Sequence, residues 1–338
     1  MLGDGYFGTV YQVKNKFDKK PYAMKVMTKP TSDKRREHLA QEIFILKNLK
    51  SPFLCNMFHH FKTDTKHYFI MEFFPGGDLF YLQARQVKFS EEEARFYLAE
   101  VTIGLEFLHS HNVVHRDLKT ENLMLDKKGH IKFIDFGASK ILRKGEKANT
   151  FCGTRRFMAP EMLNRQEYDH KVGIWSYGIM MFDLLTGHGL FEGKTDEDIE
   201  ELVLSGKMFP RPRGMSTKAI KLLRTLLEFS PLKRATVSQL KQSEFFKNLD
   251  WNKVSSQQYQ PPFKPTFADE FDLSHFDEEF TQKLVLQSPH KGVIMEEKEN
   301  NQFTGFDFDT GVTTMPPAAK RLLTTDEHQQ IFMQDKKL

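Results

Sequence analysis

The sequence predicts an α+β fold with two lobes, a small one rich in strands and a larger one that is mostly helical. Residues 1–28 alternate apolar runs with glycine-rich and polar turns, which is typical of short strands. The apolar segment HYFIMEFF then stops at Pro75-Gly76-Gly77, a break that indicates a hinge between lobes. Beyond it, helical patterns cover residues 90–111, 174–186, 196–206, 216–228 and 236–247.

The first lobe carries a glycine-rich turn and a lysine inside an apolar strand. LGDGYFGTVYQV spaces Gly3, Gly5 and Gly8 so that backbone N–H groups can approach phosphates. The same spacing opens dinucleotide-binding units, but a helix must follow there. Here the pattern continues as a strand from Val10, which disfavours that alternative. Lys25 lies in YAMKVM and needs an anionic partner.

The segment HLAQEIFILKNLK supplies a candidate for that partner. Its apolar residues recur at helical spacing, and Glu42 borders the apolar face. Residues 90–111 form a longer predicted helix, in which Ser90 and Glu93 have the spacing of a capping box.

The segment HRDLKTEN, His115–Asn122, has the strongest functional pattern. It precedes a short predicted strand, LMLD, and then FIDFG, which contains Asp135. Phosphoryl transfer needs a carboxylate for a hydroxyl proton, a cation for phosphate oxygens and oxygen ligands for a metal. Asp117, Lys119, Asn122 and Asp135 supply these groups at the right spacing.

Composition limits the other possibilities. The 338-residue chain has a formal charge of +4, which is small for its length and gives no sign of nucleic-acid binding. Cys55 and Cys152 are the two cysteines and have no metal-ligand spacing, which fits a reducing compartment. No apolar run reaches membrane-spanning length and no signal peptide is evident. We expect a cytoplasmic or nuclear, monomeric protein without a transmembrane segment.

From about residue 250 the chain changes character. QPPFKPTF is proline-rich, and FDEEF, QSPH and FTGFDF follow as isolated clusters in polar surroundings. Such a segment cannot form a core of its own, so its Phe residues need a groove elsewhere on the protein. The alternative is a disordered tail with chance aromatic residues. TTDEHQQIF, near the end, has the pattern of a short helix.

Taken together, these motifs resemble a eukaryotic protein kinase, and the resemblance covers nearly the whole chain. The tail narrows it to the AGC group of serine/threonine kinases, and PPFKP and FDEEF are similar to the tails of protein kinase B and the ribosomal-protein kinases. Where those kinases carry a phosphorylated Ser or Thr, this chain has the acidic residue Asp307. In this it resembles protein kinase N and the atypical protein kinase C enzymes. The resemblance implies an N-lobe at 1–74, a C-lobe at 75–246, the AGC tail at 247–311 and an extension of unknown role at 312–338.

The resemblance also implies residue roles, with ATP and Mg²⁺ as cofactors. Asp117, Lys119, Lys25 and Glu42 would be catalytic, Lys25 being paired with Glu42. Asn122 and Asp135 would hold the metal, and Glu161 would pair with Arg234. The residues expected around ATP are Leu2, Gly3, Asp4, Gly5, Tyr6, Phe7, Gly8, Thr9, Val10, Ala23, Lys25, Met71, Glu72, Phe74 and Met124.

Control and substrate choice follow from the same resemblance. Thr150 would be phosphorylated by an upstream kinase, and Arg116, Lys140 and His38 would bind its phosphate. Phe303, Phe306 and Asp307 would act in tail docking, and Ser288 would be a further regulatory residue of the tail. Asp78, Glu121 and Asp183 match acidic positions that bind basic residues upstream of the target Ser or Thr; three unrelated surface acids are the alternative.

Four features depart from the family pattern. The chain begins at the glycine loop, which fits either a truncated gene prediction or a short lobe. Gly173 stands where the family has an Asp that supports the HRD backbone. Arg155 and Arg156 replace Pro and, usually, Glu in the loop that seats the residue after the target hydroxyl. Thr120 replaces a usual Pro. The rival hypothesis to an active kinase is therefore a catalytically weak scaffold or ATP-binding switch.

Overall fold

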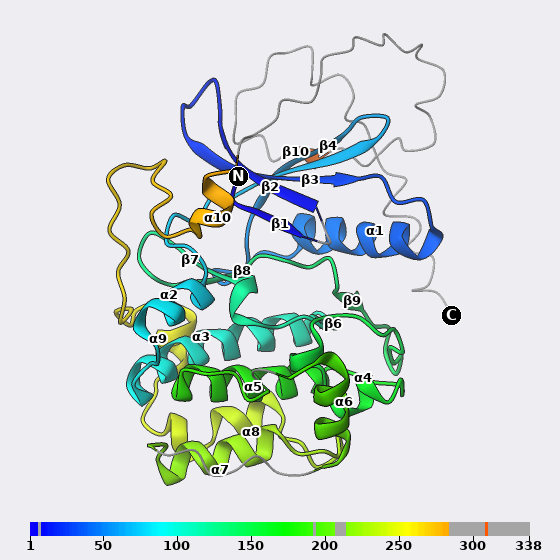
Figure 1. Ribbon diagram of the computed structural model, residues 1–338, viewed down its shortest axis with the longest axis vertical. Coiled ribbons are helices and arrows are strands. Elements are labelled where there is room, and N and C mark those ends of the chain that lie inside the picture. Colours follow the sequence, from blue (N-terminus) through cyan, green and yellow to red (C-terminus); the bar gives the residue numbers. More distant parts are fainter. Residues whose placement is uncertain (6–7, 192–193, 207–213, 284–307, 310–338) are drawn as a thin grey trace. The chain divides into compact units, whose positions relative to one another are not determined.

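The computed structural model describes residues 1–5, 8–191, 194–206, 214–283 and 308–309 (Figure 1). They divide into two compact units. The first contains Met1–Pro30, Asn56–Phe73 and the described residues from Asp277 on; the second contains Thr31–Cys55 and Phe74–Phe276. The expected lobe at 1–74 is thus shared between the units, because its helical segment groups with the second. No helix within these described ranges is long and apolar enough to cross a membrane.

The first unit is an antiparallel sheet. Its strands are β1 (Gly3–Gly5), β2 (Gly8–Lys14), β3 (Pro21–Thr28), β5 (Lys66–Met71), β4 (Met57–Lys62) and β10 (Phe308–Asp309), in that order. The predicted strands within 1–28 and at HYFIM are confirmed. Because a strand, β2, begins at the third glycine, Gly8, where a dinucleotide-binding unit needs a helix, the dinucleotide alternative is wrong. The short helix α10 (Glu278–Thr281) also belongs to this unit.

Strand β4 was not predicted from the sequence. A bulge between Met57 and His59 breaks the alternation of apolar and polar residues along the strand. His59 and His60, which look polar in sequence, are also buried. At the edge of β4, the backbone of Phe308 and Asp309 pairs with that of His60 and His59, so part of the tail adds a strand to the sheet.

The second unit is mainly helical, and its helices begin where capping residues allow. α1 (Asp33–Asn48) is capped by Ser32, and α2 (Leu79–Gln86) by Asp78. α3 (Glu91–Ser110) has the predicted capping box, with both the Ser90 and Glu93 side chains bonded to the backbone. Two small antiparallel sheets flank the catalytic loop: β6 (Val113–Val114) pairs with β9 (Lys140–Ile141), and β7 (Leu123–Leu125) with β8 (Ile131–Phe133).

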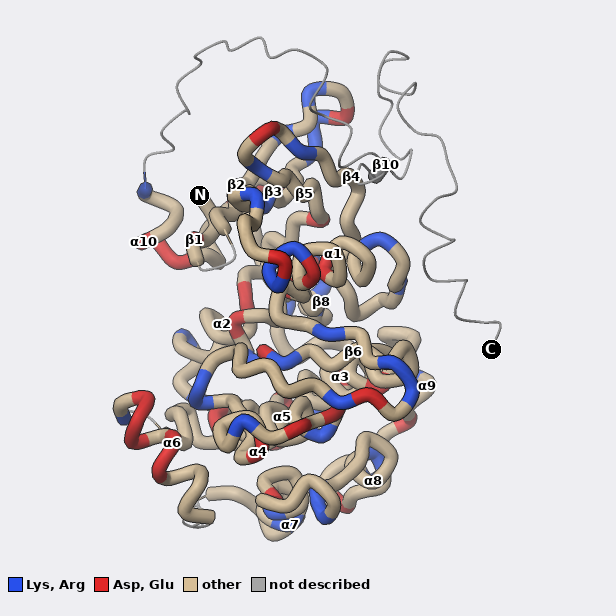
Figure 2. Tube along the Cα trace, turned by 90° about the vertical axis from the view of Figure 1, so that its right-hand side faces the viewer, with Lys and Arg blue, Asp and Glu red and all other residues tan. Residues whose placement is uncertain are grey.

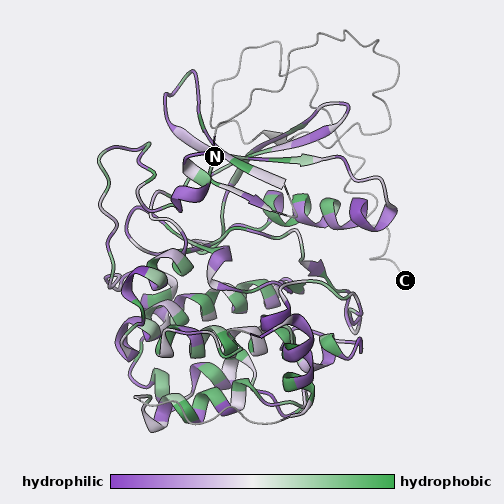
Figure 3. Cartoon of the chain, viewed as in Figure 1, coloured by the Kyte–Doolittle hydropathy of each residue, from purple (hydrophilic) through white to green (hydrophobic). Residues whose placement is uncertain are grey.

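Helix α5 (Lys171–Thr186) lies in the core of this unit. Fourteen of its residues are buried, which explains its nearly continuous apolar sequence (Figure 3). The prediction of a buried helix at 174–186 is confirmed, with one further turn at its start. The other elements that follow β9 in this unit are η2 (Arg155–Phe157), α4 (Pro160–Leu163), α6 (Asp196–Leu204), α7 (Thr217–Leu226), α8 (Val237–Lys241), η3 (Glu244–Phe246) and α9 (Trp251–Ser255).

The predicted helix at 236–247 is two shorter elements. α8 ends at Lys241, and the 3-10 turn η3 follows. Phe245 and Phe246 are adjacent and both are buried. Neighbouring residues of an α-helix point about 100° apart, so one continuous helix is poorly suited to bury both rings.

A buried ion pair joins distant parts of this unit. Arg234 donates from Nη1 to Glu161 Oε1 at 2.6 Å and from Nη2 to Oε2 at 2.9 Å. The guanidinium of Arg234 also donates to the carbonyl groups of Glu228 and Lys171. The predicted pair of Glu161 and Arg234 is therefore confirmed, and it connects the start of α4 to the chain after α7.

Candidate active site

The catalytic loop brings Asp117 against the loop at Thr154. The Thr154 backbone N–H donates to Asp117 Oδ1 at 2.9 Å, and its hydroxyl donates to the same oxygen at 2.8 Å. The ammonium group of Lys119 lies 3.2 Å from Asp117 Oδ2 and 2.8 Å from the Thr154 hydroxyl oxygen. The carboxylate of Asp117 and the ammonium group of Lys119 therefore lie together beside the Thr154 hydroxyl.

Asn122 is fixed by the same carboxylate. Its amide nitrogen donates to the Asp117 carbonyl at 2.7 Å and contacts Asp117 Oδ2 at 3.2 Å. With the nitrogen engaged, the amide oxygen is the end of the side chain that remains to bind a ligand. Asp135 accepts the Gly137 N–H at 3.1 Å through Oδ1.

Oxygen donors of this kind suit Mg²⁺, which is usually held by one or two protein side chains together with substrate phosphates. Across the described ranges no group of three or more His, Cys, Asp or Glu side chains could hold a metal ion. The side chains of Asn122 and Asp135 supply oxygen atoms of the type that Mg²⁺ prefers, so the donor chemistry is compatible with the expected metal.

The first unit places several predicted nucleotide-binding residues on one face of its sheet. Val10 lies directly opposite Lys25, and Ala23 lies directly opposite Met71. Opposed residues of an antiparallel pair point to the same face, as do residues two apart in a strand. Since Ala23 and Lys25 are two apart, all four side chains share a face. Lys25 itself is buried.

Three further nucleotide-binding candidates have defined backbone positions. Leu2 donates its N–H to the carbonyl of Val10 at 2.7 Å, and Glu72 donates its N–H to Asn56 at 2.9 Å. Gly8 has a φ of +119°, and a side chain there would clash with the Val26 carbonyl oxygen. Only glycine fits that position. The remaining candidates in this strand region are Gly3, Asp4, Gly5 and Thr9; Thr9 donates its hydroxyl to Asp4 at 2.7 Å.

The other predicted catalytic and nucleotide-binding residues, Glu42, Phe74 and Met124, belong to the second unit. Glu42 lies on the buried face of α1. Met124 forms an isolated backbone bridge with Asp78, at the start of α2.

Two of the predicted substrate acids lie close together. Asp78 accepts the Tyr81 N–H at 2.7 Å. Burial first, and then the negative charge of Glu121, raise the pKa of Asp78 to about 6. Within the described part of the chain, neither carboxylate has a cation at ion-pair distance. The two side chains therefore form an acidic pair for which the described residues supply no ion-paired cation.

The third predicted substrate acid has a different environment. Asp183 lies in α5 with its side chain 4% exposed, and its Oδ2 is 3.1 Å from Arg156 Nη2. Its Oδ1 accepts the Leu190 N–H at 3.0 Å. Asp183 is thus ion-paired inside the protein, unlike Asp78 and Glu121.

The predicted regulatory residues of the second unit gather around Arg116. This buried residue has a φ of +67°, and its guanidinium donates to Ala138, Ser139 and the Tyr168 hydroxyl. Tyr168 in turn donates to the Thr150 carbonyl at 2.6 Å. Lys140 is paired with Glu146 at 3.0 Å.

His38 belongs to the same cationic group. Burial lowers the pKa of His38, and the positive charge of Arg116 lowers it further, followed by smaller effects of Lys34 and Lys140 that Glu37 partly opposes. Three positively charged or titratable side chains therefore lie near one another, close to a threonine whose phosphate would relieve their repulsion.

Comparison with known families identifies the chain. The sequence profile of the family described as Protein kinase domain matches residues 1–246, and that described as Protein kinase C terminal domain matches residues 268–308. The chain belongs to the protein kinase family. Its tail domain supports the AGC group of serine/threonine kinases within that family.

Individual relatives agree. The chain is 40% identical over 318 residues to human ribosomal protein S6 kinase alpha-1, covering 91% of the chain and 43% of that relative. It is 39% identical over 335 residues to ribosomal protein S6 kinase 2 alpha of Xenopus laevis, covering 94% of the chain and 45% of the relative. The chain thus spans less than half the length of these two kinases.

The kinase site includes contacts that sequence analysis missed. Thr154 contacts both Asp117 and Lys119. The only sequence evidence for a role of Thr154 was its presence in the segment CGTRRFMAPE. Tyr168 links Arg116 to Thr150 and had no local signal, because it is distant from both in sequence. Six predicted site residues lie outside the described residues: Tyr6, Phe7, Ser288, Phe303, Phe306 and Asp307.

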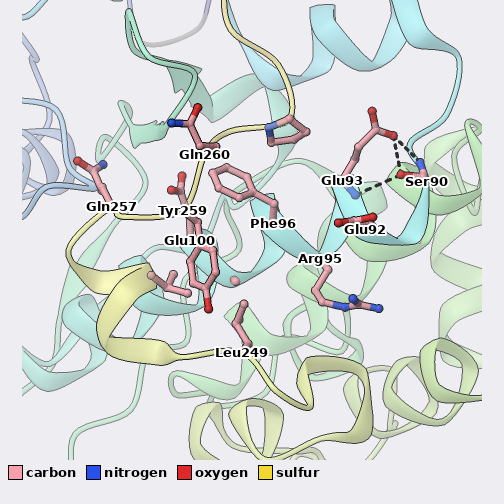
Figure 4. Close-up of a pocket in the computed structure, with 13 residues that line it drawn as sticks. Ser90, Glu92, Glu93, Arg95, Phe96, Glu100, Leu249, Gln257, Tyr259 and Gln260 are labelled. Carbon is pink, nitrogen blue, oxygen red and sulfur yellow. Dashed lines mark hydrogen bonds between the residues drawn. The ribbon is translucent and has the colours of Figure 1, made fainter.

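A separate pocket of about 510 Å³ lies beside α3 (Figure 4). The start of α3, α9 and the chain from Gln257 to Pro262 line it, with Phe96 and Tyr259 among the aromatic residues. None of the predicted site residues contributes to this pocket, so its volume is not part of the catalytic arrangement.

Proposed function

We propose that this kinase transfers the γ-phosphoryl group of ATP to Ser or Thr hydroxyls of proteins, in sequences with upstream basic residues. The observation that carries the proposal is the cluster of Asp117, Lys119, Asn122 and Thr154, joined by contacts of 2.7–3.2 Å. The parts needed for positioning and charge neutralisation are held in one place by the fold, and phosphoryl transfer depends mainly on these two effects.

In the proposed reaction the substrate hydroxyl oxygen attacks the γ-phosphorus, and the bond to the β–γ bridging oxygen breaks, releasing ADP. Asp117 accepts the hydroxyl proton. Lys119 would approach the γ-phosphate oxygens, and Lys25 would contact the α- and β-phosphates, with Glu42 as its proposed partner. Magnesium, when bound through Asn122 and Asp135, neutralises charge on the phosphates.

Glycines of the first turn would let the backbone approach the phosphates. Leu2, Val10, Ala23 and Met124 would enclose adenine, next to the backbone of Glu72–Phe74 and with Met71 as gatekeeper. Four of these residues support this role through the shared sheet: Leu2 pairs with Val10 in the backbone, and Val10, Ala23 and Met71 share a face with Lys25.

The acidic pair supports a preference for basic substrates. A substrate cation between Asp78 and Glu121 would relieve the repulsion that raises the pKa of Asp78. An Arg upstream of the target hydroxyl provides a planar group that suits carboxylates.

Regulation would act at two places. Phosphorylated Thr150 would draw Arg116, Lys140 and His38 together, with Lys140 exchanging Glu146 for the phosphate. The tail would dock through Phe303 and Phe306, with Asp307 giving permanent negative charge and Ser288 as a further regulatory residue. We propose a monomeric enzyme of the cytoplasm or nucleus, activated by an upstream kinase.

One observation favours a second candidate, a catalytically weak kinase that acts as a scaffold or ATP-binding switch. Gly173 supplies no side chain where the family has a carboxylate. The nearest side-chain atoms to a Cβ placed there are Leu105 Cδ2 at 3.7 Å and His109 Nε2 at 3.8 Å.

Transfer from radiolabelled Mg-ATP to a peptide with upstream arginines tests the two candidates. We expect label on a Ser peptide, none on the matching Ala peptide, and loss of labelling with EDTA. Lys25→Met should abolish transfer while the protein stays folded, because Met preserves the aliphatic packing of the lysine stem. Lys20→Met, at an exposed position, is the control. A folded, ATP-binding wild type that labels no peptide would support the weak-kinase candidate.

A further inference from the structure

We infer that Arg156 neutralises Asp183 and blocks it as a binding site, so that this kinase recognises upstream basic residues through Asp78 and Glu121 and not through Asp183. The inference rests on the proposed function and assigns one residue of the chain as a determinant of substrate choice. Arg156 is the residue that replaces the usual Glu of the family, and its guanidinium lies 3.1 Å from the Asp183 carboxylate.

Both carboxylate oxygens of Asp183 are already engaged. Oδ2 meets Arg156, and Oδ1 accepts the Leu190 N–H at 3.0 Å. The backbone carbonyl of Asp183 also accepts a hydrogen bond from the Gln83 side chain at 2.8 Å, which fixes this part of α5. With 4% of its side chain exposed, Asp183 has little surface left for a substrate guanidinium.

A substrate arginine would therefore have to displace Arg156. The exchange replaces one guanidinium–carboxylate contact with another of the same kind, so it contributes little net affinity. The displaced Arg156, whose side chain is 30% exposed in its present position, would then add positive charge next to a positively charged peptide. Both effects disfavour recognition of a basic residue at Asp183.

The loop carrying Arg156 is anchored on either side. Thr154 is bonded to Asp117, and the Phe157 carbonyl accepts the Ser176 hydroxyl at 2.8 Å. Phe157 is buried, and the Arg156 guanidinium lies 4.6 Å from the centre of its ring. Arg156 is thus supported by a fixed segment between the catalytic carboxylate and α5.

Arg155 offers a matched control on the same loop. Its guanidinium pairs with Asp196 at 3.1 Å and with Glu200 at 3.0 Å, both on α6. Figure 2 shows the acidic residues along this helix. Arg155 and Arg156 have the same charge and adjacent positions, but only Arg156 contacts Asp183.

The test measures binding of a set of fluorescent peptides in which one upstream arginine at a time is replaced by alanine. We expect the wild type to lose affinity for replacements at the positions read by Asp78 and Glu121. Arg156→Gln should create one additional preferred position in the peptide. A peptide arginine at that position should improve affinity about tenfold, because it can bind the carboxylate of Asp183 that Arg156 no longer neutralises. Arg155→Gln should create no additional preferred position. The double variant Arg156→Gln, Asp183→Asn should lack the preference that Arg156→Gln creates.

Asp183→Asn alone provides a second readout that does not require Arg156→Gln to fold. The inference predicts that it leaves the wild-type pattern of preferred positions unchanged. Loss of a preferred position in Asp183→Asn, or an unchanged pattern in folded Arg156→Gln, would overturn it. Because binding is measured apart from phosphate transfer, a protein with the expected binding pattern and no transfer would contradict the proposed function alone.

Discussion

Arg234 binds Glu161 through two parallel hydrogen bonds inside the helical unit, with 0% and 3% of their side chains exposed. Removing one partner of a buried pair leaves a charge without compensation. We expect Glu161→Ala to lower the free energy of unfolding by about 3–5 kcal/mol. Urea denaturation of the variant beside the wild type measures this loss.

Lys247→Ala supplies the comparison for that experiment. Lys247 pairs with Glu244 at 3.7 Å, and both side chains are more than half exposed. Loss of this exposed ion pair should lower the free energy of unfolding by about 0–1 kcal/mol. Equal destabilisation by the two substitutions would show that the buried pair does not brace the unit.

The acidic pair predicts a pH dependence of substrate binding. The pKa of Asp78 is raised to about 6, so its carboxyl group is ionised above that pH and protonated below it. A cationic peptide binds the ionised form. The KM for an arginine-containing peptide should therefore rise as the pH falls below about 6, by up to about tenfold per pH unit, the limit for one proton.

Asp78→Asn should remove this dependence and raise KM at neutral pH. A peptide with alanine at the upstream positions should show no matching rise in the wild type. Parallel profiles for the two peptides would rule out the assigned role of Asp78.

Phosphorylation of Thr150 should raise turnover by at least about tenfold. One charge-assisted hydrogen bond contributes about 1.5–3 kcal/mol, and about 1.4 kcal/mol corresponds to a factor of ten. Phosphatase treatment should lower the activity of phosphorylated wild type to that of Thr150→Ala and leave the variant unaffected. Phosphate should also raise the lowered pKa of His38, which NMR titration can follow. Equal turnover with and without phosphate would refute this control.

Gly173 allows a test of the missing carboxylate. Burial first, and then the charge of His170, lower the pKa of His109 to about 3. Between pH 6.5 and 3 the unfolded chain therefore binds a proton that folded His109 does not, and stability falls as the pH decreases. Gly173→Asp places a carboxylate beside His109 Nε2, so it should raise this pKa and reduce the loss.

Gly173→Ala is the matched control. It should stabilise the helix by about 0.5–1 kcal/mol without altering the acid dependence. Gly173→Asp should retain more stability at pH 5 than the alanine variant, and more activity than the wild type. A lower melting temperature at pH 7 for Gly173→Asp than for the wild type would show that the backbone has adapted to glycine.

Local sequence patterns predicted much of this fold. The capping box of Ser90 and Glu93 and the apolar run of α5 each depend on residues near one another in the chain, where spacing is informative. β4 was not predicted because its bulge and its buried histidines obscure the alternation of apolar and polar residues that is typical of a strand. The division of 236–247 depended on burial of two adjacent Phe rings, which is a tertiary effect.

In the candidate site, too, the residues predicted from the sequence belong to local motifs, whereas the contacts that were missed join distant residues. HRDLKTEN and DFG predicted roles for Asp117, Asn122 and Asp135 because the proposed chemistry needs those residues at short, fixed spacings, and the structure brings Asn122 into contact with Asp117. The contacts of Tyr168 with Thr150 and of Arg156 with Asp183 join residues 18 and 27 positions apart. Only packing decides whether such residues meet, and the charge of Asp183 alone could not reveal that its own protein neutralises it.

The most direct test of the proposed kinase activity compares the wild type with Asp117→Asn in transfer from Mg-ATP to an arginine-containing Ser peptide. Asn preserves the shape of the side chain but cannot accept the hydroxyl proton, so turnover should fall about 10²- to 10⁴-fold while ATP binding remains. Asp64→Asn, at an exposed turn position, should match the wild type. A folded Asp117→Asn variant that keeps most of the wild-type turnover would contradict the assignment of Asp117 and the mechanism built on it.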